Sequence, residues 1–64
     1  MEITSSHKGQ SVKTANVKVE PGTSLDAATA FAMSHFNETP ASLMDWDADY
    51  YPAESVVTVR LYTD

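Results

Sequence analysis

Residues 45–51 contain the densest set of chemically useful side chains in this sequence, in the order Asp-Trp-Asp-Ala-Asp-Tyr-Tyr. Acids at positions 1, 3 and 5 match an EF-hand calcium loop, which also needs a glycine at position 6 and a glutamate at position 12. Counted from Asp45, those two positions hold Tyr50 and Val56, although Glu54 could serve as a ligand in a looser site. We therefore expect neither a metal nor any other cofactor.

The same segment has the composition of a protein-recognition surface. Trp and Tyr dominate the binding energy of many protein interfaces, and acids around them steer a basic partner. Alternatively, the Trp and one Tyr close the end of a small core while the acids stay solvated. The two interpretations are compatible, because one ring can face inward while its neighbour faces out. The expected partner-binding residues are Asp45, Trp46, Asp47, Asp49, Tyr50, Tyr51 and Glu54.

Groups that could support catalysis or nucleotide binding are isolated from one another. His35 falls in an apolar helical stretch, where a neutral histidine in the core or at its edge is the simplest interpretation. Serines are frequent, but no strand-turn-helix nucleophile elbow accompanies them. Gly9 and Gly22 belong to no phosphate-binding pattern. We expect a protein that is not an enzyme.

Charge is distributed unevenly along the chain. Residues 1–19 carry three Lys against one Glu, a net charge of +2, whereas residues 20–64 carry eight acids against Arg60, a net charge of -7. Such a field disfavours direct nucleic-acid binding and favours a protein with a basic surface, including a nucleic-acid-binding protein. Lys8, Lys13 and Lys18 are five residues apart, so they form no stripe on one strand face.

The length of 64 residues allows one small domain, residues 1–64, with a thin core. With no Cys and only two His, neither a disulfide framework nor a structural zinc site can support it. Partner binding or self-association is therefore a natural source of extra stability. No stretch approaches the eighteen apolar residues of a membrane span, so we expect a cytoplasmic protein without membrane contact.

Two stretches, residues 11–20 and 55–63, alternate apolar and polar side chains with the period of a half-buried strand. Residues 2–6 are rich in β-branched and hydroxyl side chains and predict a weaker strand, joined to residues 11–20 by a turn at Gly9. Pro52 and the crowded acids of residues 45–54 suit a loop better than a regular element.

A helix is predicted after Pro21-Gly22, with Thr23 or Ser24 as its cap. At 100° per residue, the face expected to lie on the sheet holds Leu25, Ala28, Phe31, Ala32, His35 and Phe36. The opposite face holds Asp26, Ala27, Ala30, Met33 and Ser34. Because that face carries one charge among small and apolar residues, Ala30 and Met33 form a candidate homodimer face. A short second helix is expected from residue 40 to about residue 45.

These elements indicate an α+β fold with two layers in the order ββαβ. The expected sheet has three strands, antiparallel or mixed, with one main helix packed on one face and the short second helix after it. The order of strand, turn, Thr-Ser-Leu-Asp-Ala-Ala helix, acidic aromatic loop and closing Val-Val-Thr-Val-Arg strand, over residues 15–63, resembles small acidic host-takeover proteins of bacteriophages. These include inhibitors of host RNA polymerase and anti-CRISPR proteins. The resemblance implies a protein that occupies a basic surface of a host machine.

Two functional hypotheses follow from the sequence. The first is a non-enzymatic, protein-binding inhibitor that docks on a basic partner through the acidic aromatic segment. The alternative is a self-associating structural or accessory protein that forms a homodimer through its helix or a sheet edge.

Overall fold

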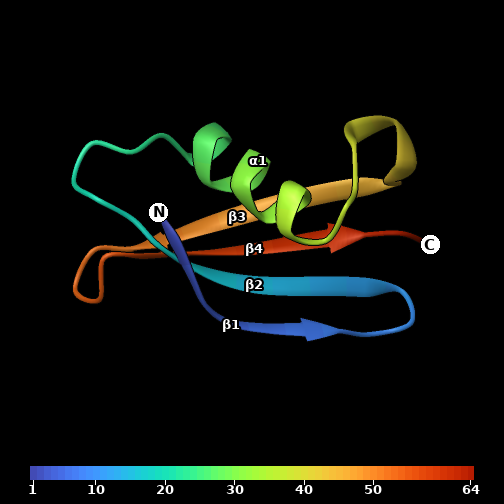
Figure 1. Ribbon diagram of the computed structural model, residues 1–64, viewed down its shortest axis with the longest axis horizontal. Helices are drawn as coiled ribbons and strands as arrows, with labels where there is room; N and C mark the ends of the chain where they lie inside the picture. The colour runs from blue at the N-terminus through green and yellow to red at the C-terminus, as the bar shows by residue number, and fades with distance from the viewer.

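Two β-hairpins and one helix make up the fold in the computed structural model, which describes residues 1–64 (Figure 1). The elements in chain order are β1 (Glu2–Lys8), β2 (Val12–Lys18), α1 (Leu25–His35), the 3-10 helix η1 (Pro40–Ser42), β3 (Asp45–Tyr51) and β4 (Val56–Tyr62). The helix lies across one face of the sheet, and the other face has no helix over it (Figure 1). The expected two-layer α+β arrangement is therefore confirmed.

The sheet has four antiparallel strands in the order β1-β2-β4-β3. The sequence predicted three, so the count was wrong by one. The additional strand is β3, in the segment expected to be a loop. Its acids and aromatics alternate with a period of two, and seven consecutive residues pair with β4 without a break in register. Every β3 residue except Ala48 is exposed, which is why no apolar alternation marked this strand.

Strand β1 is regular enough to form a full hairpin with β2, although only Ile3 anchors it on the helix side. The register shifts between Ile3 and Ser5, which is the mark of a β-bulge. Gly9 closes the turn by donating its N–H to the Val12 carbonyl at 2.9 Å. A Cβ at this glycine would lie 2.9 Å from that same oxygen, so a side chain here would force the turn to shift.

The core lies between α1 and the two central strands. Its largest fully buried side chains are Val17, Val57, Val59 and Leu61, all from β2 and β4. The helix contributes Ala28 and Ala32 to this core. These small side chains let the helix axis approach the sheet closely, so valines and one leucine are enough to fill the space.

The helix begins at Ser24, which is one of the two predicted caps. The Ser24 Oγ accepts a hydrogen bond from the Ala27 N–H at 3.0 Å. Thr23 has a different role, because its hydroxyl donates to the Glu20 carbonyl at 2.7 Å and stabilises the preceding turn. Gly22 in that turn has a φ of +89°, where a residue with a side chain would be strained.

The rotation of α1 differs from the predicted one. The residues that it buries are Ala28, Thr29, Ala32 and Met33, whereas His35 is exposed. Thr29 can lie inside because its hydroxyl donates to the Leu25 carbonyl at 2.8 Å. Placing Met33 on the outer face and His35 on the sheet face was therefore wrong. Of the two candidate dimer residues, Ala30 is exposed and Met33 belongs to the core.

After the helix, the chain turns at Asn37 and forms η1, which is shorter than the predicted second helix. The Glu38 carboxylate accepts hydrogen bonds from the Lys13 ammonium and the Ser42 hydroxyl. This contact ties the end of α1 to β2, on the helix side of the sheet. None of the helices is long and apolar enough to cross a membrane.

Candidate functional site: the outer strand β3

Strand β3 divides the predicted binding residues between two faces of the sheet. Asp45, Asp47 and Asp49 stand opposite Tyr62, Arg60 and Thr58 of β4, on the face that no helix covers. Trp46, Ala48 and Tyr50 stand opposite Leu61, Val59 and Val57, whose side chains are buried beneath α1. The acids and two of the three aromatic residues therefore lie on opposite faces of one strand.

Arg60 holds two of the carboxylates in place. Its Nε lies 2.6 Å from Asp47 Oδ1, and its Nη2 donates to Asp49 Oδ2. The hydrogen bond to Asp49 and the charges of both aspartates raise the pKa of the Arg60 guanidinium above its usual range. The Tyr62 hydroxyl donates to Asp47 Oδ2 at 3.1 Å. The side chains of Asp47 and Asp49 are still 48% and 55% exposed, so they can meet a partner.

Asp45 has a separate contact at the start of the strand. Its Oδ1 accepts a hydrogen bond from the Trp46 N–H at 2.8 Å. Three acids on one face of β3 against a single Arg leave this face of the hairpin with a net charge of -2. Glu54, in the turn that follows, is exposed and adds to the same field.

The aromatic side chains of β3 are exposed to solvent over nearly half of their surface. Trp46 is 41% exposed and Tyr50 is 46% exposed, on the helix side. Ala48 lies between them on the same face and is partly buried against the core. Two large rings therefore flank a small residue along the outer edge of the sheet. Tyr51 is equally exposed, at 47%, but it lies on the uncovered face, the same face as the three aspartates.

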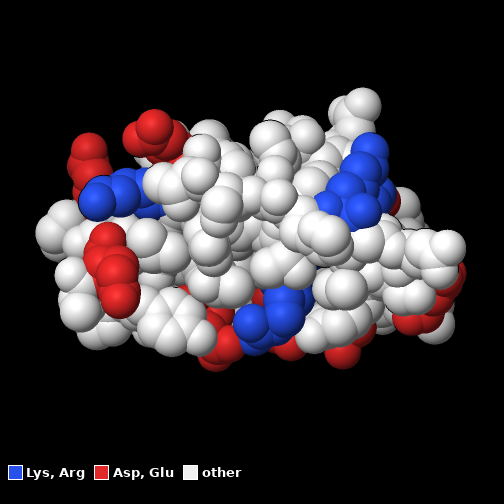
Figure 2. Space-filling model, turned by 90° about the horizontal axis from the view of Figure 1, so that it is seen from below, with Lys and Arg blue, Asp and Glu red and all other residues white.

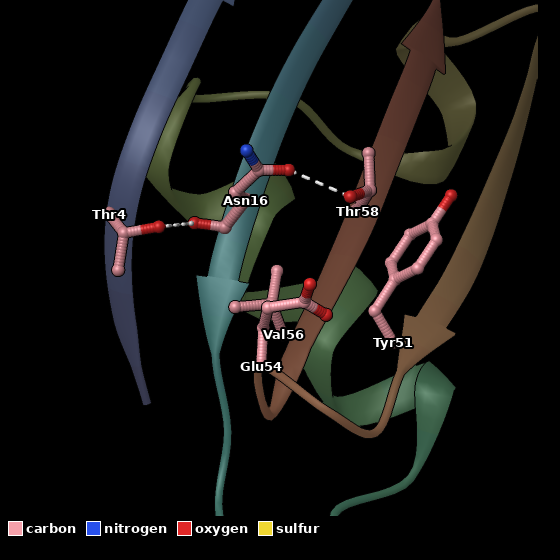
Figure 3. Close-up of a pocket in the computed structure, with 6 residues that line it drawn as sticks. All are labelled: Thr4, Asn16, Tyr51, Glu54, Val56 and Thr58. Carbon is pink, nitrogen blue, oxygen red and sulfur yellow. Dashed lines mark hydrogen bonds between the residues drawn. The ribbon is translucent and has the colours of Figure 1, made fainter.

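A shallow hollow of about 270 Å³ opens beside Tyr51 on the uncovered face (Figure 3). Its lining residues are Thr4, Asn16, Tyr51, Glu54, Val56 and Thr58. Asn16 organises the polar part: its Oδ1 accepts from the Thr58 hydroxyl at 2.7 Å, its carbonyl accepts from Thr4 at 3.2 Å, and its Nδ2 donates to Ser5 at 2.8 Å. These groups bond one another and cross-link the strands, which gives them a structural role.

Basic side chains are scattered. Viewed from the β1 side, the Lys and Arg atoms stand in separate groups with other residues between them (Figure 2). Lys13 forms an ion pair with Glu38, and Arg60 forms ion pairs with Asp47 and Asp49 of β3.

A second hollow, of about 440 Å³, lies beside the C-terminal end of α1. Ala30 and Met33 contribute to its lining, together with Asn37 and residues up to Pro40. Met33 is only 7% exposed, so of the two candidate dimer residues Ala30 alone is exposed at this place.

Arg60 and Tyr62 lie against the aspartates of β3, and neither residue was predicted from the sequence to belong to the site. A signal for both was present: residues 45–51 and 56–62 flank a short turn with Pro52, which is typical of a hairpin. Pairing those segments would have placed Arg60 opposite Asp47. Comparison of this chain with protein families, curated proteins and solved structures found no match.

Proposed function

We propose that this chain is a non-enzymatic protein-binding module, which docks on a basic surface of another protein through β3. The observation that carries the proposal is the exposure of β3 on both faces, with three carboxylates on one and two aromatic rings on the other. Occupation of a basic surface is also how an inhibitor of the phage type would act on a host machine.

The acidic face supplies attraction and orientation. Charges of one sign on a surface raise the association rate with an oppositely charged partner, and salt weakens the effect. Arg60 makes the surface more specific, because it fixes Asp47 and Asp49 while leaving about half of each side chain accessible. A partner with Lys or Arg side chains meets carboxylates that are already positioned and loses less conformational entropy on binding.

The aromatic residues supply the affinity. Large rings that are half exposed in the free protein can bury substantial apolar area in a complex, at little cost in side-chain entropy. The backbone of Trp46 and Tyr50 is paired with β4, so the strand presents both rings on the helix side of the sheet.

The test is affinity capture from lysate with tagged protein, washed at about 50 mM and about 500 mM salt, where screening differs strongly. The triple variant D45N/D47N/D49N removes the acidic face of β3. Its matched control, E20Q/D26N/D64N, removes the same amount of charge from other exposed positions. We expect the control to retain a salt-sensitive basic partner and the β3 variant to lose it. Equal retention by both variants, each checked to be folded by circular dichroism, would refute the proposed site.

A further inference from the structure

The outer backbone edge of β3 has a hydrogen-bonding pattern that follows from the sheet register. The Val19 N–H donates to the Ser55 carbonyl, and the Thr63 N–H donates to the Ser11 carbonyl, both at 2.9 Å. Bonded and non-bonded pairs alternate along an antiparallel ladder. Between these two points, the backbone N–H and C=O groups of the odd-numbered residues of β4 therefore bond β2. Those of the even-numbered residues point toward β3.

The same alternation continues across β3. The residues opposite the even-numbered positions of β4 are the three aspartates and Tyr51, so their backbone groups are used inside the sheet. Trp46, Ala48 and Tyr50 must then direct their N–H and C=O groups outward. The Trp46 N–H donates to the neighbouring Asp45 carboxylate, in agreement with this outward direction. Ala48 and Tyr50 are left with free donors and acceptors at the edge of the sheet.

We propose that β3 binds its partner by strand addition: an extended segment with alternating basic and apolar residues pairs with this edge as a fifth strand. This inference rests on the proposed function and specifies its binding mode. Residues of the added strand opposite Asp47 and Asp49 lie on the acidic face and are Lys or Arg. The residue opposite Ala48 lies on the helix side, where Ala48 leaves room between Trp46 and Tyr50, and is apolar.

Charge argues against a second copy of β3 as the occupant. Two β3 strands paired antiparallel about Ala48 would place Asp47 of one copy opposite Asp49 of the other on the same face. Like charges directly opposite one another destabilise a strand pair. The sheet's other edge, β1, is interrupted by the shift between Ile3 and Ser5, and bulges of this kind hinder strand addition. β3 pairs along its full length without such an interruption.

The probe for this inference is the peptide Lys-Val-Lys-Val-Lys-Val-Lys, compared with a block peptide of the same composition, Lys-Lys-Lys-Lys-Val-Val-Val. Trp46 is the single tryptophan of the chain and lies on the strand to which the peptide would pair, so its fluorescence reports binding. We expect the alternating peptide to bind at least about tenfold more tightly than the block peptide, since only the alternating one can satisfy both faces. In the complex, exchange of the Ala48 and Tyr50 amide protons slows at least about tenfold.

Ala48→Pro separates strand addition from simple charge attraction. Proline removes the outward N–H, and on an edge strand it can be accommodated with its nitrogen toward solvent. We expect this variant to lose the preference for the alternating peptide. A synthetic chain with N-methyl-Ala48 repeats the test if the proline variant does not fold.

Equal binding of both peptides, or no change in exchange at Ala48 and Tyr50, would overturn strand addition while leaving the acidic surface as a binding site. Failure of both peptides to bind at millimolar concentration would also overturn it. The proposed function itself fails only if the capture experiment shows no dependence on the β3 acids.

Discussion

Val59 and Val56 offer a matched test of the packing described here, because they are the same residue on opposite faces of β4. Val59 is 0% exposed and faces α1, whereas Val56 is partly exposed and lines the hollow on the uncovered face. Changing either valine to alanine removes two methyl groups. The loss of intrinsic strand propensity is the same at both positions. The difference between the two variants therefore isolates burial under the helix.

The expected magnitude follows from the volume and area that are lost. Two buried methyl groups are worth about 1.6 kcal/mol of transfer free energy. The cavity left beneath the helix adds up to about 1 kcal/mol. Val59→Ala should therefore lower the free energy of unfolding by roughly 1.6–2.6 kcal/mol, and Val56→Ala by about 1 kcal/mol or less. A domain of this size has only about 3–10 kcal/mol in total, so the first variant should be clearly weakened.

Urea denaturation followed by circular dichroism measures this difference. With a slope of about 1 kcal/mol per molar urea, the midpoints of the two variants should differ by roughly 1–2 M. In thermal melts, Val59→Ala should lower Tm by roughly 10–20 °C. Equal shifts for Val56→Ala and Val59→Ala would refute the placement of α1 over the odd-numbered residues of β4.

Three further outcomes are expected. Hydrogen bonds from Lys13 and Ser42 lower the pKa of Glu38 in the folded protein. The ionised Glu38 side chain therefore contributes its full stabilisation above the pKa of the unfolded chain, about 4.3. This contribution is lost as the pH falls through the pKa of the folded protein. The urea midpoint of the natural chain should consequently fall more steeply below about pH 4.3 than that of Glu38→Gln. Ser24→Ala removes the helix cap and should cost about 1 kcal/mol in thermal unfolding. Arg60→Met removes the ion pairs with Asp47 and Asp49 and should cost below about 1 kcal/mol at low salt, with the loss shrinking in about 1 M NaCl.

Each of these outcomes has a contrary result. Parallel pH curves for the natural chain and Glu38→Gln would mean that the carboxylate is not held by Lys13 in solution. An unchanged melt for Ser24→Ala would place the start of the helix elsewhere. A destabilisation by Arg60→Met that persists at high salt would point to lost packing rather than to lost ion pairs.

The central strands could be predicted from the sequence because both are half buried. Val57, Val59 and Leu61 alternate with polar residues, and burial on one face produces that period directly. β3 could not be found in this way, since an edge strand exposed on both faces needs no apolar alternation. Its period of two is carried by aspartates instead, which ordinarily disfavour strands. Here Arg60 and Tyr62 on the paired strand stabilise them.

The helix start was predictable from local chemistry, but its rotation was not. A capping serine acts through its own hydroxyl and a nearby N–H. The rotation depends on the shape of the sheet below, against which Ala28, Thr29, Ala32 and Met33 are buried and Phe31 is only partly buried. The candidate site was similarly half predictable. The sequence singled out the acidic and aromatic residues of β3 as candidates, whereas their division between two faces of the sheet follows from the pairing with β4.

The central ladder between β2 and β4 also determines how this chain must fold. The two strands of each hairpin are adjacent in the sequence, so the β1-β2 and β3-β4 pairs can form within microseconds. The ladder joins the two halves of the chain, and it cannot form until the segment containing α1 has closed as a loop. Closing that loop costs chain entropy before the core repays it. We therefore expect the rate-limiting step to be the closure of this loop, which brings β2 and β4 together.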